Sequence, residues 1–184
     1  MAVEDKRVRR TKKLLRQALA ELMREKEFKN ITVSDVVRRA DINRGTFYVY
    51  YRDVYDLREK VENELVDALR GTIEGALPEV MAHASMRPVI EQAVRYLEEN
   101  YDLAFVLLRD SGVGSFEDKL MQLMEECSQQ LMPPQSDADR FSIWFVAAGC
   151  IGLLKKWMIQ PVPAARDAVL DRLDELLCRI LQPA

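Results

Sequence analysis

Histidine is almost absent from this chain. Its single histidine, His83, excludes paired-histidine zinc sites and the histidine-centred triads of hydrolases. The phosphate-binding loops GxGxxG and GxxxxGK[ST] are also missing. Neighbouring carboxylates occur at Glu98-Glu99 and Glu125-Glu126, but adjacent side chains diverge on a helix. We therefore expect no enzyme, no metal site and no cofactor.

Cysteines and long apolar runs are also scarce. The three cysteines, Cys127, Cys150 and Cys178, lie in helical apolar patterns, which indicates free thiols in a reducing cytosol. The longest uncharged run, 141–154, is shorter than the roughly 20 residues that span a bilayer. The charged start of the chain lacks the apolar segment of a secretory signal. These features predict a cytoplasmic protein with no membrane partner.

Charge is distributed unevenly along the chain. The net charge is −3, yet residues 1–60 hold 16 Lys/Arg against 10 Asp/Glu. Residues 61–184 hold 11 Lys/Arg against 20 Asp/Glu. A polyanion would attract the first part and repel the second, so the basic head is the candidate nucleic-acid-binding part.

Apolar residues recur at helical spacing almost throughout, and no useful strand-like alternation is present. We expect an all-α fold of about nine helices, near 8–26, 33–40, 44–51, 53–75, 87–99, 101–111, 116–131, 138–159 and 165–181. Gly71, Gly75 and Pro78 place a domain border in their vicinity. The prediction is a helix-turn-helix DNA-binding domain at 1–52, a connecting helix at 53–75, and a regulatory and dimerisation domain at 76–184.

The segment 31–51 has the pattern of a helix-turn-helix. Thr32 is a natural cap for the first short helix and Asn43 for the second, with only a few residues between them. Their inward positions would share one apolar core, formed by Val36, Val37, Ala40, Ile42 and Phe47. Such a motif places the start of its second helix in the major groove of DNA.

The outward positions of this motif are the predicted DNA contacts. Arg44 can pair with guanine, and Thr46 can reach a base edge or a thymine methyl group. Gly45 allows the backbone to approach closely, while Tyr48 and Tyr50 can donate to phosphates. The amides that begin the first helix suit a further phosphate. The full predicted set is Thr32, Ser34, Arg44, Gly45, Thr46, Tyr48, Tyr50 and Arg52.

Residues 9–70 resemble the N-terminal domain of the TetR/AcrR family of bacterial regulators. The resemblance rests on the order and spacing of Met23–Phe28, Ile31–Asp35, Asn43–Tyr48, Tyr51–Asp53 and Leu57. It implies an all-α homodimer whose two heads bind an inverted repeat of double-stranded DNA. It also implies a variable C-terminal domain that senses a ligand and thereby releases the DNA.

Three residues depart from the family pattern. Asp41 stands where the family usually has glycine, and aspartate tolerates a left-handed backbone better than most residues. Tyr50 replaces a frequent histidine, and Val54 replaces a frequent lysine. We expect Arg52 to substitute for the missing lysine, so the phosphate contacts should differ from the usual pattern of the family.

The segment 143–154 is apolar on every side, so a helix formed there must be buried all round. We expect a second copy of the chain to cover one side and the last helix to complete a two-fold four-helix interface. A monomer core is the alternative. The predicted interface residues are Phe145, Ala148, Gly149, Gly152, Leu173, Leu176, Leu177 and Ile180.

Methionine and aromatic residues of the C-terminal part suit an adaptable ligand pocket, although ordinary helix cores contain the same residue types. The candidates are Tyr96, Tyr101, Phe105, Arg109, Phe116, Met121, Met124 and Trp144. The sequence thus predicts a repressor that binds a palindromic operator as a homodimer and is released by a small molecule. A DNA-binding adaptor controlled by a protein partner, and a helical interaction protein without a DNA role, are the alternatives.

Overall fold

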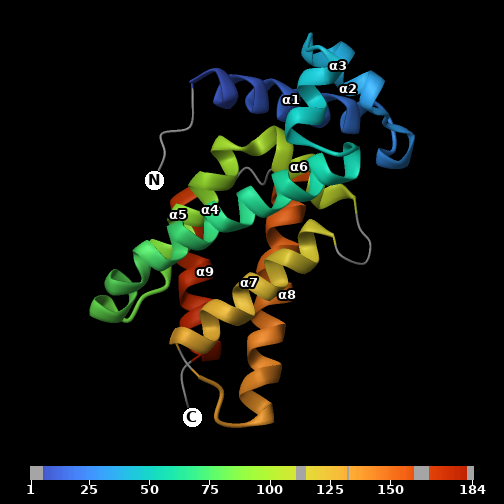
Figure 1. The fold of residues 1–184 in the computed structure, drawn as a ribbon. Coiled ribbons are helices and arrows are strands. Elements are labelled where there is room, and N and C mark those ends of the chain that lie inside the picture. The colour runs from blue at the N-terminus through green and yellow to red at the C-terminus, as the bar shows by residue number, and fades with distance from the viewer. Residues whose placement is uncertain (1–5, 111–114, 132, 160–165, 182–184) are drawn as a thin grey trace. The chain divides into compact units, whose positions relative to one another are not determined.

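The computed structural model describes residues 6–110, 115–131, 133–159 and 166–181. These residues form nine α-helices and one short 3₁₀ helix and contain no strand, so the predicted all-α fold is confirmed (Figure 1). The elements are α1 Lys6–Glu25, η1 Phe28–Asn30, α2 Val33–Ala40, α3 Arg44–Tyr50, α4 Val54–His83, α5 Arg87–Glu99, α6 Tyr101–Arg109, α7 Phe116–Leu131, α8 Asp137–Ile159 and α9 Arg166–Leu181.

The chain divides into two compact units. The first contains the residues up to Glu64 together with Asp102–Asp110, and the second contains Leu65–Tyr101 with the described residues after 110. The first unit therefore includes most of α6, which the sequence had placed in the C-terminal domain. Helix α4 contributes residues to both units.

The first unit has a dense apolar core. Leu15 and Leu19 lie one turn apart on α1, so both side chains face inward and are fully buried. Their neighbours in this unit include the fully buried side chains Val36 of α2, Phe47 of α3, Leu57 of α4 and Leu107 of α6. Because every helix contributes to this core, α2 and α3 are held by packing as well as by their caps.

Helix α4 is longer than the sequence predicted. It runs through Gly71, Gly75 and Pro78 to its end at His83. The two glycines lie on the exposed face with open space around them, while Ala76 and Val80 are buried on the opposite face. Burial of that apolar face stabilises the helix across residues that would otherwise end it.

The second unit is built from α5, α7, α8 and α9 with the later part of α4. An apolar cluster joins Ile90 and Val94 of α5 to Val146 of α8 and to Leu170 and Leu177 of α9. Helix α8 has the length and apolar composition of a membrane-spanning helix, a property that core helices of water-soluble proteins share. Only part of α8 is buried within this chain, so some of its apolar surface is exposed.

Candidate nucleic-acid interface

A reciprocal capping box begins α2. The amide of Asp35 donates to the Thr32 hydroxyl at 3.2 Å, and the amide of Thr32 donates to the Asp35 carboxylate at 3.0 Å. Lys26 adds a 2.7 Å ion pair to the same carboxylate. The ammonium of Lys26 and the two donors of Thr32 hold the pKa of Asp35 well below its usual range. The predicted cap is thus present, and the Thr32 amide is engaged within it.

The turn between α2 and α3 depends on Asp41. This residue adopts a left-handed conformation with φ 52° and ψ 49°, as the sequence predicted for the position usually held by glycine. The next amide, of Ile42, donates to the carbonyl of Val37 at 3.0 Å and so closes the end of α2. This single left-handed residue sets the angle at which α3 leaves the turn.

Asn43 caps α3, also as predicted. Its side-chain oxygen accepts a 2.7 Å hydrogen bond from the amide of Gly45. A Cβ atom at Gly45 would lie 3.2 Å from that oxygen, which is tighter than an ordinary contact. Phe47 and Tyr51 are buried in the core beneath, so the opposite face of α3 is the one that solvent reaches.

Arg44 is held in place on the outer face of α3. Its guanidinium donates to the Ser34 hydroxyl at 3.3 Å and to the Tyr48 hydroxyl at 3.1 Å. Its Cζ atom also lies 5.6 Å from the centroid of the Tyr48 ring. The structure therefore brings three predicted contact residues together around one cationic group.

The charge of Arg44 is not compensated within its surroundings. Arg39 of α2, by comparison, pairs with Glu25 at 2.7 Å and with Glu21 at 3.2 Å, and these carboxylates raise its pKa. Among the described residues, Arg44 has no carboxylate partner, and both of its hydrogen-bond acceptors are neutral hydroxyls. Arg44 thus presents a full positive charge where a helix-turn-helix meets DNA.

The junction of α3 and α4 is organised by the buried carboxylate of Asp56. It accepts hydrogen bonds from the amide of Arg52 at 2.9 Å and from the ammonium of Lys60 at 3.0 Å. The Arg52 amide and then the Lys60 ammonium lower the pKa of Asp56. The Arg52 side chain is largely exposed, so it remains a candidate phosphate contact, whereas Val54 is buried in the core.

Sequence reasoning missed two residues of this surface. Val49 is the most exposed large apolar side chain of α3, with 73% of its surface accessible. Lys60 lies one turn beyond Asp56 and donates to the carbonyl of Tyr50 at 3.0 Å, next to the C-terminus of α3. Val49 could have been found from helical spacing, because it follows Gly45 by four residues. Lys60 is ten residues from Tyr50 in sequence, so only the packing of α4 against α3 reveals it.

The predicted pocket residues are not brought together. Met124 lines a cavity of about 570 Å³ in the second unit. Tyr96 instead lines a separate polar cleft with residues of α4 and α5, and the Tyr101 hydroxyl donates to the carbonyl of Met158 at 2.8 Å. Phe116 is buried in the core.

The remaining candidates lie elsewhere. Arg109 stacks 5.4 Å from the ring centroid of Phe105, and both belong to the first unit. Trp144 is exposed and meets Phe141 edge to face, and Met121 is absent from the described cavity lining. Of the candidates, Met124 alone is in the described lining of this cavity. The aromatic content of a helix does not show which of its faces will be buried, so it did not identify the other lining residues.

The predicted interface residues divide between two faces of α8 and α9. Phe145, Ala148, Gly149 and Gly152 are exposed on α8, and Leu176 and Ile180 are exposed on α9. Leu177 is buried in the unit's own core, and Leu173 is half-buried against the same cluster. These two leucines share a helix face with the buried Leu170, so they belong to the core rather than to an exposed apolar surface.

The fold and this surface define a class of protein, an all-α chain with an N-terminal helix-turn-helix. The family model described as "Bacterial regulatory proteins, tetR family" matches residues 15–61, and the model described as "Transcriptional regulator C-terminal region" matches residues 84–178. The chain therefore belongs to the TetR family of bacterial regulatory proteins, as its sequence resemblance indicated.

Similar proteins agree with this assignment. The chain is 39% identical over 168 residues to the "uncharacterized HTH-type transcriptional regulator YxbF" of Bacillus subtilis strain 168, covering 89% of this chain but only 43% of that protein. It thus spans less than half the length of this relative. Two solved structures share its fold with TM-scores of 0.64. They are the "dihydroxyacetone kinase operon activator DhaS" (19% identity; 93% of this chain and 96% of that one) and the fatty acid degradation regulator FadR of Bacillus halodurans (14% identity; 96% of each).

Proposed function

We propose that this protein is a DNA-binding transcriptional repressor that acts in the cytoplasm and has no catalytic role. The observation that carries the proposal is the uncompensated guanidinium of Arg44, fixed at the start of α3 by Ser34 and Tyr48. An ordered arginine at this end of a recognition helix can form the bidentate contact to guanine that is common in the major groove.

The remaining contacts are proposed for exposed and partly exposed residues of the same motif. Thr46 and Val49 would touch base edges or thymine methyl groups, and their contacts would add sequence preference. Tyr50, Arg52 and the Ser34 amide at the start of α2 would bind phosphates and fix the register of the head on the duplex. The basic first turns of α1 would add sequence-independent attraction.

We propose a homodimer formed through α8 and α9. Phe145 is 70% exposed on α8, and Ile180 is 38% exposed on α9. A Cβ atom at Gly149 or Gly152 would have no neighbour within 4 Å, so a partner helix could approach closely there. A two-fold dimer would present two heads to a palindromic operator.

Release by a small molecule is proposed on the basis of the apolar cavity in the second unit. Such a ligand must bind better to the state that does not bind DNA, because only a difference in affinity shifts the equilibrium. The cavity favours this mechanism over control by a protein partner. One similar protein is named an operon activator, so a reporter gene read with and without the regulator is needed to establish repression.

Selection of bound fragments from a random DNA pool tests the proposal. We expect a two-fold symmetric consensus, and Arg44→Ala should weaken binding to it by about 1–3 kcal/mol. Arg95→Ala removes an equal charge from an exposed position of α5 and should leave binding unchanged. Enrichment of no sequence, or equal binding by the two variants, would contradict the proposal.

A further inference from the structure

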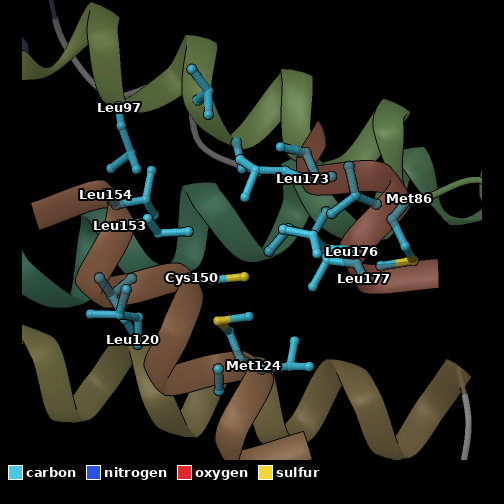
Figure 2. Close-up of a pocket in the computed structure, with 18 of the residues that line it drawn as sticks. Met86, Leu97, Leu120, Met124, Cys150, Leu153, Leu154, Leu173, Leu176 and Leu177 are labelled. Atoms are coloured by element: carbon cyan, nitrogen blue, oxygen red, sulfur yellow. The ribbon is translucent and has the colours of Figure 1, made fainter. Parts of the chain in front are cut away.

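The second unit contains an apolar cavity of the size of a small-molecule site. Residues of α4, α5, α7, α8 and α9 line a partly open space of about 570 Å³, and the labelled side chains point toward it (Figure 2). Close-packed interiors contain few voids larger than a water molecule. A space of this size lies within the range of about 300–1,000 Å³ that is typical of small-molecule sites.

The interior of this cavity offers almost no hydrogen bonds. The side chains labelled in Figure 2 are leucines, Met86, Met124 and Cys150, and the rest of the described lining is also mainly aliphatic. The hydroxyl of Ser128, a polar group of the lining, already donates to the carbonyl of Glu125 at 2.7 Å. A polar ligand would lose its hydration without replacement, whereas a hydrocarbon would gain contacts throughout.

The charged side chains of the described lining are both basic. Lys156 of α8 and Arg172 of α9 are exposed, and no acidic residue is in the described lining. Arg172 pairs with Glu175 at 2.6 Å, but Lys156 has no ion-pair partner among the described residues. An anionic head group at the rim would therefore meet an uncompensated positive charge.

We propose that this cavity binds a saturated hydrocarbon chain that carries an anionic head group, with the chain inside and the head group at Lys156. This inference names the ligand class of the release mechanism proposed above and rests on that proposal for its regulatory meaning. The binding itself needs no DNA, so it can be measured on its own.

Calorimetric titration of the full chain with the carboxylates from octanoate to tetradecanoate tests the ligand class. Each added methylene should lower Kd about fourfold until the cavity is full, since each buried methylene stabilises by about 0.8 kcal/mol. Binding should also show a negative heat-capacity change. Dodecanol should bind more weakly than dodecanoate. The Kd of dodecyl phosphate, compared with that of dodecanoate, shows whether the site prefers a phosphate or a carboxylate head group.

Two variants and one control variant locate the ligand. Ala93 is half-buried on α5 in the cavity lining, so Ala93→Phe should fill the space and weaken dodecanoate binding at least tenfold. Ala68→Phe places the same side chain on the exposed face of α4 as a control. Lys156→Gln should remove the preference for dodecanoate over dodecanol, with little effect on the dependence on chain length.

The outcomes separate this inference from the proposed function. Affinity that is independent of chain length, or unchanged by Ala93→Phe when that variant melts like the wild type, would overturn the inference even if the protein binds its operator. If Ala93→Phe does not fold, a flat chain-length series alone overturns it. Chain-length-dependent binding by a protein that enriches no DNA sequence would support the cavity assignment and refute the regulatory one.

Discussion

Arg44 and Tyr48 lie one turn apart on α3 and form a single contact surface. The Arg44 guanidinium donates to the Tyr48 hydroxyl at 3.1 Å while its Cζ atom lies 5.6 Å from the ring centroid. A side chain that is already ordered loses less conformational entropy when it binds. Tyr48 therefore acts as a positioning residue for Arg44, in addition to the phosphate contact expected from its sequence position.

Tyr48→Phe tests this relationship. It keeps the ring beneath the guanidinium and removes one hydrogen bond, so operator affinity should fall by about 0.5–1.5 kcal/mol. Tyr48→Ala should weaken binding further, because the cation–π contact is lost as well. Fluorescence anisotropy with the selected DNA measures both effects, and Tyr96→Phe in the second unit is the matched control. Full affinity in Tyr48→Ala would rule out a positioning role.

Salt dependence distinguishes base contacts from phosphate contacts. Arg52→Gln should weaken binding to all sequences alike and reduce the slope of log K against log salt by about 0.9, the value for one lost phosphate contact. Arg44→Gln should instead relax the preference at one base pair of each half-site. Affinities measured at several salt concentrations on the consensus and on single-base variants give both results. The assignments would be reversed if Arg52→Gln changed base preference and Arg44→Gln did not.

The capping box makes the stability of the first unit dependent on pH. The folded-state pKa of Asp35 is lowered, so its contribution is fully present above the ordinary value of about 3.9 and is lost as pH falls towards the lowered pKa. Urea unfolding should therefore show a difference in free energy between wild type and Asp35→Asn at neutral pH that shrinks below about pH 4. Asp67→Asn, at an exposed position of α4, should follow the wild-type profile. A constant difference across this range would contradict the role given to Asp35.

The proposed dimer can be tested at its most exposed apolar position. Phe145→Glu would place a charge at a surface that the second copy buries, so sedimentation should show monomers at concentrations where the wild type is dimeric. The monomer should bind a two-half-site operator much more weakly than the dimer does. Met81→Glu, at an exposed position of α4, should sediment like the wild type. A dimer that persists in Phe145→Glu would place the interface elsewhere.

The local geometry of the recognition motif was predictable from the sequence. Thr32 and Asn43 act as caps, and Asp41 adopts the left-handed conformation that the turn requires. These features depend on hydrogen bonds and backbone sterics among residues at most a few positions apart. The burial of Phe47 was equally predictable, because helical periodicity assigns it to the inner face of its helix.

Contacts between residues far apart in sequence determine the length of α4 and the lining of the cavity. Helix α4 continues past Gly75 and Pro78 because Ala76 and Val80 are buried. Local helix propensity cannot predict this burial. The cavity is lined by five helices, and its members are aliphatic residues indistinguishable in sequence from core positions. The sequence by itself determined the all-α class, the caps and the turn of the helix-turn-helix, and the family. Only the tertiary structure decided which apolar faces pack together and which line a space, since that outcome depends on the packing of all five helices at once.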